Sequence, residues 1–378
     1  MTLEEKYADQ MRQIFPTKID LPMFTLKTQI EEQINLAPDF QRRERWNDER
    51  RSRFIESIIM NVPIPPVFLG EEDYGRYVVL DGRQRLTAAY DFLSDRLRLK
   101  GLKVWKELNG NNYSDLKRKG LERTIERRFL PAVLLTRESS PEVKYDVFDR
   151  LNTGGVVANP MEVRNAIYRG PFSKLLHALS ADADFRALWG IPEDRTELEK
   201  NTLFREMHDL ELVLRFFALM PGTLGGLRFK DRLSETMLEK NREYEERPKA
   251  AADDKERFLR AIGKAKVILG AEAFRRREKS GELGSRSVPF ADAILQAMGD
   301  IQEPVESALV PKIRAALTGL WSNETFLAAV STGTNGESAI RVRISLARRA
   351  VGEALGRVVD DASGGQTGLT IPKRRRKT

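Results

Sequence analysis

The sequence predicts an α+β domain, a small mixed sheet with helices, over residues 1–170, and a mainly α-helical domain over residues 171–357. Two observations predict this division. In the first part, short apolar runs such as "RYVVL" (76–80) and "FLPAVLL" (129–135) alternate with helical patterns. After it, helical spacing is nearly continuous, from "FSKLLHALS" to "ESAIRVRISLARRAVGEALGRVV". The last stretch, 358–378, is predicted to be a flexible tail that ends in the basic cluster "KRRRKT".

The first helix and strand of the core are predicted within "LAPDFQRRERWNDERRSRFIESIIMNVPIPPVFLGE" (36–71). Four apolar residues recur at helical spacing and are expected to face a core: Phe54, Ile55, Ile58 and Ile59. Two prolines then lead into the strand "VFL". The same stretch offers Gln41 and Arg42 as polar candidates for a binding site.

The next element, "VVLDGRQRLTAAYDFL" (78–93), is predicted to be a buried strand that turns into a helix. Asp81 as N-cap with Gln84 at N3 fits a capping box, but Arg83 and Arg85 oppose the positive end of the helix dipole. Free backbone N–H groups, a glycine for close approach (Gly82) and two guanidiniums together predict a phosphate site. Asp81 would hold a Mg²⁺ that bridges to the phosphate, or orient a water molecule for attack.

The third element is "VFDRLNTGGVVANPMEVRNAIYRG" (147–170), which places a glycine-rich loop before a helix. The loop residues Asn152, Thr153 and Gly154 can bring backbone amides to a ligand. "NPME" predicts a capping box with Pro at N1, so that a helix begins there. Three polar residues of this helix either cap it or point into the site: Glu162, Arg164 and Asn165.

Composition bounds the function. A net charge of +8 favours a polyanionic partner, and the absence of cysteine excludes disulfides, zinc fingers and thiol nucleophiles. No apolar run is long enough to span a bilayer and no signal peptide is evident, so a cytoplasmic protein without a membrane partner is expected. His177 and His208 lie in helical patterns and are predicted to be packed or surface residues, which argues against an HNH nuclease. The polar run 240–256 is predicted to be an exposed connection or a frayed helix end.

Two basic stretches are candidates for contact with nucleic acid. Residues 41–53 contain six arginines and only three acidic residues, and "KRKGLERTIERR" (117–128) is similarly rich in cations. The residues predicted to contact DNA phosphates are Arg50, Arg51, Lys117, Arg118 and Lys119. A solvated basic surface without this role is the alternative.

In their order and spacing, "PDFQRR", "SRFIESIIMNVPIPPVFL", "VVLDGRQRLTAAYDFL" and "FDRLNTGG…NPMEVRNAIY" resemble the N-terminal domain of GmrSD-type restriction enzymes, a family in the ParB/sulfiredoxin-like superfamily. The resemblance is dense over about residues 20 to 170. It implies a ParB/sulfiredoxin-like α+β fold whose signature turn binds a nucleoside triphosphate, with hydrolysis in some members, in prokaryotic defence against phage or foreign DNA. The signature has Arg83 where the family usually has Gln, and an Arg cannot accept a hydrogen bond. By position, Gln41 and Arg42 should line the same pocket.

Full-length GmrSD-type enzymes carry an HNH-type nuclease after this domain, whereas helices and a basic tail follow it here. The resemblance therefore implies a sensor or switch subunit that is a metal-dependent nucleoside triphosphatase. Its expected partner is a separately encoded nuclease or effector, or a second copy of the same chain in a homo-oligomer. Modified or phage DNA is the expected trigger or partner. The second hypothesis is a DNA-binding regulator that hydrolyses nothing, and the third is a DNA nickase that uses carboxylates of the first domain.

Overall fold

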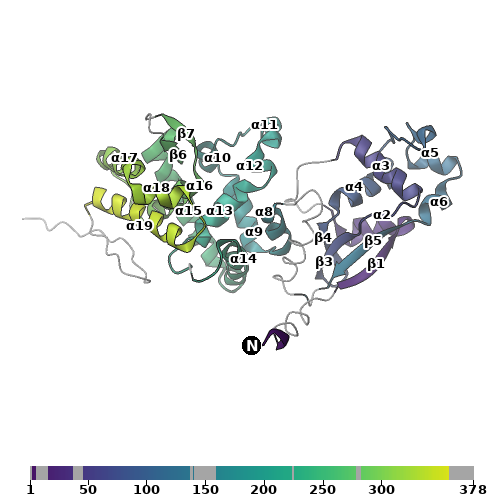
Figure 1. Ribbon diagram of the computed structural model, residues 1–378, viewed down its shortest axis with the longest axis horizontal. Helices are drawn as coiled ribbons and strands as arrows, with labels where there is room; N and C mark the ends of the chain where they lie inside the picture. The colour runs from purple at the N-terminus through teal and green to yellow at the C-terminus, as the bar shows by residue number, and fades with distance from the viewer. Residues whose placement is uncertain are drawn as a thin grey trace, which may run out of the picture. The chain divides into compact units, whose positions relative to one another are not determined.

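The computed structural model describes residues 2–5, 16–36, 46–136, 139, 159–223, 225–277 and 282–356. The chain divides into an N-terminal unit, residues 1–167, and a C-terminal unit, residues 168–378 (Figure 1). Among the described residues, every helix is either too short or too polar to span a bilayer.

A five-stranded mixed sheet is the framework of the N-terminal unit (Figure 1). Its strands, in spatial order, are β1 (Pro16–Pro22), β5 (Phe129–Leu135), β3 (Val67–Asp73), β4 (Arg76–Asp81) and β2 (Ile34–Asn35). Strand β5 pairs antiparallel with β1 and parallel with β3, while β4 pairs antiparallel with β3 and parallel with β2. The predicted small mixed sheet is confirmed, although the two edge strands β1 and β2 were not expected from the sequence.

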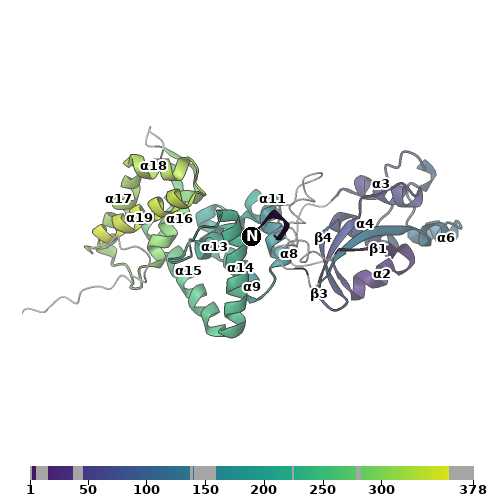
Figure 2. The same ribbon diagram turned by 60° about the horizontal axis from the view of Figure 1, so that its bottom comes forward.

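Three helices cover one face of this sheet (Figures 1 and 2). They are α2 (Met23–Glu32), α3 (Asp48–Ile59) and α4 (Arg83–Leu93). The predicted apolar face of α3 is buried against the sheet, together with Val67 and Leu69 of β3 and Val79 of β4. Two short helices, α5 (Tyr113–Arg118) and α6 (Glu122–Glu126), complete this layer through Leu116 and Ile125. Because successive side chains of a strand point to opposite faces of the sheet, the residues between these in β3 and β4 point to the other face.

Helix α8 (Pro160–Ile167) packs on that opposite face. Its Val163 joins a small cluster with Val78 and Leu80 of β4 and Leu135 of β5. The helix begins where "NPME" predicted, with Pro at N1. The sheet is thus covered by helices on both faces.

The C-terminal unit is mainly helical, as predicted. Its helices are α9 (Pro171–Ser180), α10 (Ala183–Trp189), α11 (Arg195–Lys200), α12 (Thr202–Arg205), α13 (His208–Ala218), α14 (Phe229–Glu246), α15 (Pro248–Leu269), α16 (Val288–Gly299), α17 (Val310–Gly319), α18 (Glu324–Ser331) and α19 (Glu337–Ala354). A two-stranded hairpin of β6 (Arg275–Arg277) and β7 (Leu283–Arg286), which the sequence did not predict, interrupts them. His177 and His208 lie in α9 and α13, as expected for helical residues.

Helix α16 lies at the centre of this unit, buried over nearly its whole length. Its Asp292 accepts hydrogen bonds from both Nε and Nη2 of Arg215 on α13, at 3.1 and 2.6 Å, and from Nη2 of Arg343 on α19 at 2.8 Å. Eight residues further on, Asp300 repeats the pattern with Arg257 of α15 and Arg348 of α19. Four arginines from three surrounding helices therefore converge on Asp292 of α16 and on Asp300, the residue that caps its C-terminal end.

The run 240–256, for which an exposed connection or a frayed helix end was predicted, is largely exposed but is helical on both sides of a single break. Helix α14 runs to Glu246 and α15 starts at Pro248, so that the break is confined to Arg247, whose extended backbone is what a following proline favours. Asp254 of α15 accepts hydrogen bonds from Lys240 Nζ at 2.6 Å and Tyr244 Oη at 2.7 Å, both on α14. These three residues pair the two helices, which the sequence did not predict.

Candidate functional site

The turn at residues 81–85 joins the end of β4 to the start of α4, as predicted. Its backbone differs from the prediction in one respect: the N-cap of α4 is Gly82, in a left-handed conformation with φ +89°, and not Asp81. A Cβ at Gly82 would lie 2.5 Å from Cγ1 of Val67, so only glycine fits between the turn and β3. Because glycine has no side chain, no side-chain oxygen caps the first N–H groups of α4.

Arg85 is held by the protein itself. Its Nη2 donates to Oδ2 of Asp81 at 2.7 Å, and its Nη1 donates to the carbonyl oxygens of Pro65 and of Pro66, the latter at 3.1 Å. The Arg85 side chain is 12 % exposed, and burial lowers its pKa although the Asp81 carboxylate opposes that shift. Arg85 therefore fastens the double-proline segment to the turn, a structural task that the sequence analysis did not assign to it.

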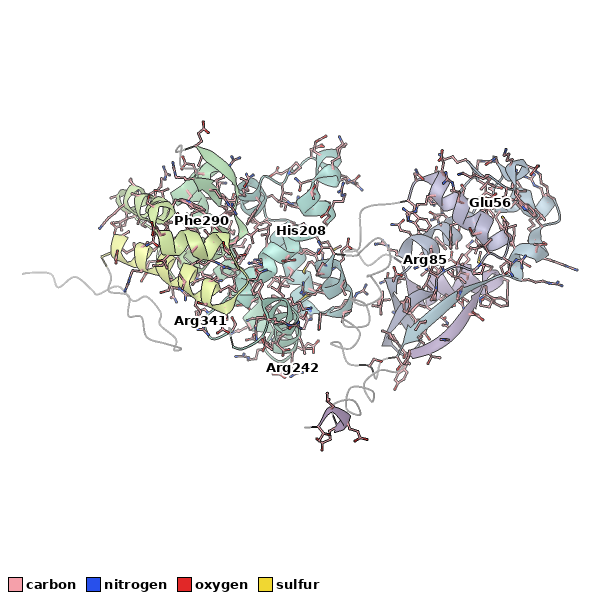
Figure 3. All side chains as sticks on the ribbon, in the orientation of Figure 1. Glu56, Arg85, His208, Arg242, Phe290 and Arg341 are labelled. Carbon is pink, nitrogen blue, oxygen red and sulfur yellow. The ribbon has the colours of Figure 1, made fainter. Side chains whose placement is uncertain are left out.

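Asp81 and Arg83 are the other two charged residues of the turn. The Asp81 side chain is 42 % exposed and shares only its Oδ2 with Arg85. Arg83 is the first residue of α4 and is partly buried. A carboxylate oxygen and a guanidinium are thus placed next to the uncapped first turn of an eleven-residue helix (Figure 3, where Arg85 is labelled).

Gln84 does not form the predicted capping box. Its Oε1 accepts a hydrogen bond from the backbone N–H of Trp46 at 3.1 Å, and this bond ties the chain before α3 to the turn. Gln41 and Arg42, which precede Trp46 in the sequence, lie outside the described residues, and so do Asn152, Thr153 and Gly154. Their predicted place in the pocket stays a prediction.

The polar residues of α8 are buried. Glu162 Oε2 accepts from the backbone N–H of Asn159 at 3.1 Å, which is one half of the predicted capping box. The other half is displaced by one residue, since Asn159 Oδ1 accepts from the backbone N–H of Met161 and not from that of Glu162. Glu162, Arg164 and Asn165 are each 5 % exposed or less, and their predicted place in the pocket stays a prediction.

The residues predicted to contact DNA are largely engaged in ion pairs. Arg51 pairs with Asp48 at 3.1 Å and with Asp91 of α4, and its side chain is only 18 % exposed. Lys117 pairs with Glu122, and Arg118 with Asp115. All of them except Arg51 are nevertheless exposed: Arg50, whose guanidinium lies 4.8 Å from the centre of the Trp46 ring, Lys117, Arg118 and Lys119.

Residues 81–85 line neither of two surface hollows that the described residues form. One is formed by the end of α2, β2, the start of β4 and Tyr90. The other is formed mainly by residues 95–101, a positively charged stretch that the sequence analysis did not single out. In that stretch, leucines alternate with cations, a pattern that is easily taken for an ordinary strand. Among the described residues, no three histidine or carboxylate side chains are grouped to hold a metal ion, so Asp81 is a lone carboxylate in this respect.

Comparison with known proteins gives one match. No curated protein and no solved structure matches the chain. The family model described as "GmrSD restriction endonuclease, N-terminal domain" matches residues 25–169. This range includes the signature turn, α8 and every strand of the sheet except β1. The resemblance drawn from the sequence motifs is thereby confirmed, and residues 25–169 belong to the GmrSD N-terminal domain family.

Proposed function

We propose that the N-terminal unit is the nucleotide-binding domain of a prokaryotic restriction or anti-phage defence system, and that its signature turn binds and hydrolyses a nucleoside triphosphate. The family match supports the first part, because the matching family is a domain of restriction endonucleases. One observation carries the second: the glycine N-cap leaves the first turn of α4 without a side-chain cap. Such a helix start is a ready anion site, since its N–H groups and its dipole both favour negative charge.

Arg83 and Asp81 would have different roles in this site. Arg83, at the first position of α4, would pair with a phosphate through its guanidinium. Magnesium commonly binds through one or two carboxylates together with the phosphates of its substrate, so a single exposed carboxylate such as Asp81 fits it. Bound there, the metal would neutralise phosphate charge. We further propose that Gln41, Arg42 and the loop residues Asn152, Thr153 and Gly154 complete the pocket.

Arg85 takes a supporting role in this proposal. Its hydrogen bonds to Asp81 and to the carbonyls of Pro65 and Pro66 fix the carboxylate and the turn. Its guanidinium thus acts on the ligand through Asp81. The sequence suggested that Arg85 contacts the phosphate directly, and this proposal replaces that contact with an indirect role.

A panel of the four nucleoside triphosphates, each with and without Mg²⁺, tests the proposal by thermal shift and phosphate release. Arg83→Ala should weaken nucleotide binding by about 10-fold or more, the worth of a charge-assisted hydrogen bond, and leave the melting temperature unchanged. Arg76→Ala, an exposed arginine at the other end of β4, is the matched control and should bind like the wild type. If the Arg83→Ala variant binds as tightly as the wild type, the turn is not the site.

The same plate separates the alternatives. Binding without phosphate release would indicate a switch that senses nucleotide without turning it over. DNA binding with no response to any nucleotide would favour a non-catalytic DNA-binding regulator, and relaxed product from supercoiled plasmid with Mg²⁺ would favour a nickase. A separately encoded nuclease or effector, or a second copy of the chain, is the proposed recipient of the signal.

A further inference from the structure

The connection between α4 and α5 carries a concentration of positive charge. Five cations and one carboxylate lie between residues 96 and 110; the cations are Arg96, Arg98, Lys100, Lys103 and Lys106. This segment follows the C-terminal end of α4, whereas the signature turn precedes its N-terminal end. The two features are therefore separate, and a ligand of one does not require the other.

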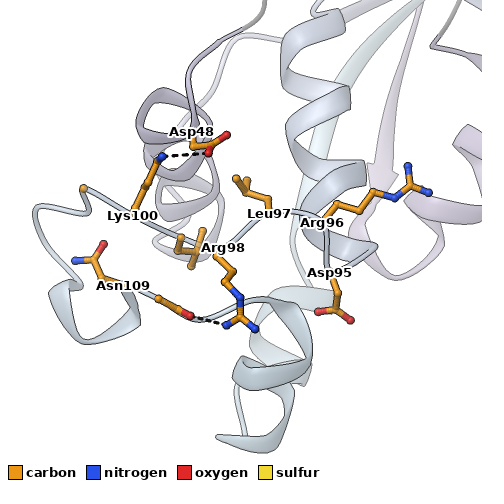
Figure 4. A pocket seen from close by; sticks show the side chains of 10 residues that line it. Asp48, Asp95, Arg96, Leu97, Arg98, Lys100 and Asn109 are labelled. Atoms are coloured by element: carbon orange, nitrogen blue, oxygen red, sulfur yellow. Dashed lines mark hydrogen bonds and ion pairs between the residues drawn. The ribbon is translucent and has the colours of Figure 1, made fainter.

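The cations of this segment are exposed: Arg96 lies over the Tyr90 ring of α4, 5.3 Å from its centre, and Arg98 Nη1 donates to the carbonyl oxygen of Gly110 at 2.9 Å. Leu97 and Leu99 are buried in the core, while Arg96, Arg98 and Lys100 alternate with them and border the hollow of about 540 Å³ (Figure 4). In an extended chain, alternate side chains lie about 6.8 Å apart along one face. The result is a row of cations along an open, polar surface and not an enclosed pocket for a small molecule.

Helix α3 holds this segment in place. Ser52 Oγ accepts from the backbone N–H of Lys100 at 3.0 Å, and the buried carboxylate of Glu56 accepts from those of Val104 and Trp105 at 3.1 and 2.8 Å (Figure 3). Asn109 Oδ1 closes the loop by accepting from the backbone N–H of Leu102 at 3.0 Å. The backbone under the cations is thus fixed before any partner arrives, which lowers the entropy lost on binding.

The charges themselves remain available. The side chains of Arg98 and Lys100 are 67 % and 57 % exposed, and their pairs with Asp115 at 3.4 Å and Asp48 at 3.1 Å are surface ion pairs of little net stability. A phosphate can therefore replace these carboxylates at small cost. Lys103 and Lys106 are exposed and have no carboxylate within 4.0 Å among the described residues. Arg51, by contrast, is committed to Asp91.

We propose that residues 96–106 form a contact surface for the phosphate backbone of duplex DNA. Cations without an exposed aromatic ring between them favour backbone contact over base stacking, and Trp105 packs against the core. Single-stranded nucleic acid, which proteins commonly bind by stacking bases on aromatic side chains, fits this surface less well. The surface contacts phosphates and contributes no base specificity of its own.

The test is a titration of the full chain with a fluorescent duplex of about 20 base pairs at several salt concentrations, without nucleotide. In one variant, Lys100, Lys103 and Lys106 are each changed to Gln. We expect its affinity to fall by about 10-fold or more and its log K against log salt slope to flatten by about 3, one for each lost phosphate contact. A circular dichroism melt confirms that the variant folds.

Two control variants make the result specific. Lys249, Lys255 and Lys312, which are exposed lysines of the C-terminal unit, are changed to Gln to remove the same charge elsewhere. Lys117→Gln with Lys119→Gln tests the other basic stretch of the N-terminal unit. The proposal is supported if only the first variant loses affinity and salt dependence. It is overturned if the wild type binds no duplex, if the first variant binds like the wild type, if the C-terminal control loses as much, or if single-stranded DNA of equal length binds more tightly.

Discussion

The guanidinium of Arg85 donates to the Asp81 carboxylate at 2.7 Å and, from its other terminal nitrogen, to the carbonyl oxygens of Pro65 and Pro66. One side chain of α4 therefore joins the end of β4 to the chain that leads into β3. Pro65 is exposed and Pro66 is half-buried, and an arginine fork can serve both of their carbonyl groups together with a carboxylate. The proposed nucleotide site depends on this internal anchor.

Arg85→Ala should lower the free energy of unfolding by about 2 to 3 kcal/mol, because it leaves the Asp81 carboxylate and two carbonyls without their donor. Chemical denaturation, followed by circular dichroism, measures the change. Arg76→Ala, which changes an exposed arginine at the start of β4, should alter stability by less than about 0.5 kcal/mol. Equal stability of the two variants would show that the Arg85 hydrogen bonds contribute nothing net.

Gly82→Ala should destabilise the N-terminal unit by more than Gly75→Ala does. Both glycines have positive φ, +89° and +74°, so each substitution incurs the strain of a left-handed alanine. Only at Gly82 would the new Cβ lie 2.5 Å from Val67, whereas nothing lies within 4 Å at Gly75. We expect the free energies of unfolding of the two variants, obtained from thermal melts, to differ by about 2 kcal/mol. Val67→Ala in the Gly82→Ala background should recover part of this difference.

The stability of α5 should depend on pH through Asp115. The backbone N–H of Asn112 and, to a smaller extent, Arg118 hold the pKa of this carboxyl below its usual range. A carboxyl whose pKa is lower in the folded state stabilises the fold above its unfolded value, about pH 4, and loses that contribution as the pH falls through the folded value. The protection factor of the Leu116 amide, which is the intrinsic exchange rate at each pH divided by the observed rate, should therefore fall on acidification. In Asp115→Asn, which keeps an acceptor for the cap, that fall should disappear.

Asp292→Asn should destabilise the C-terminal unit strongly. The carboxylate neutralises Arg215 and Arg343, which are buried with it, and removing one charge of such a cluster costs about 3 to 5 kcal/mol. The exposed pair of Asp231 with Arg228 is the matched control, and Asp231→Asn should change stability by less than about 1 kcal/mol. Urea denaturation of both variants tests the contrast, which fails if their midpoints coincide.

The elements that the sequence predicted well are those whose burial pattern is local. The apolar spacing of α3 and α4 and the runs of β4 and β5 each depend on a single element and its own periodicity. The start of α8 was placed correctly because its capping residues are adjacent in the chain. The edge strand β1 was missed because two of its seven residues are proline and most of its side chains are exposed, so it has neither alternation nor an apolar run.

The site was harder to predict because its decisive contacts join residues far apart in the chain. Asp81 and Gln84 have capping-box spacing, but Gln84 instead bonds Trp46, 38 residues away, and Arg85 bonds Pro65. Counting charges along the sequence cannot distinguish a cation that is paired inside the fold from one that is exposed. Arg51 is paired with Asp91, whereas Lys103 is exposed. Lys240, Tyr244 and Asp254 were taken as solvated for the same reason, since their partners lie on the neighbouring helix.

Asn241 binds the first residues of the C-terminal unit: its Oδ1 accepts from the backbone N–H of Phe172, and its Nδ2 donates to the carbonyl oxygens of Tyr168 and Arg169. Tyr168 and Arg169 are therefore an integral part of the helical bundle and not a spacer that can be shortened. A laboratory that expresses the two halves as separate polypeptides should cut ahead of Tyr168. A cut at Pro171 would strip the amide of Asn241 of both its acceptors and leave an unsolvated polar group beneath α9.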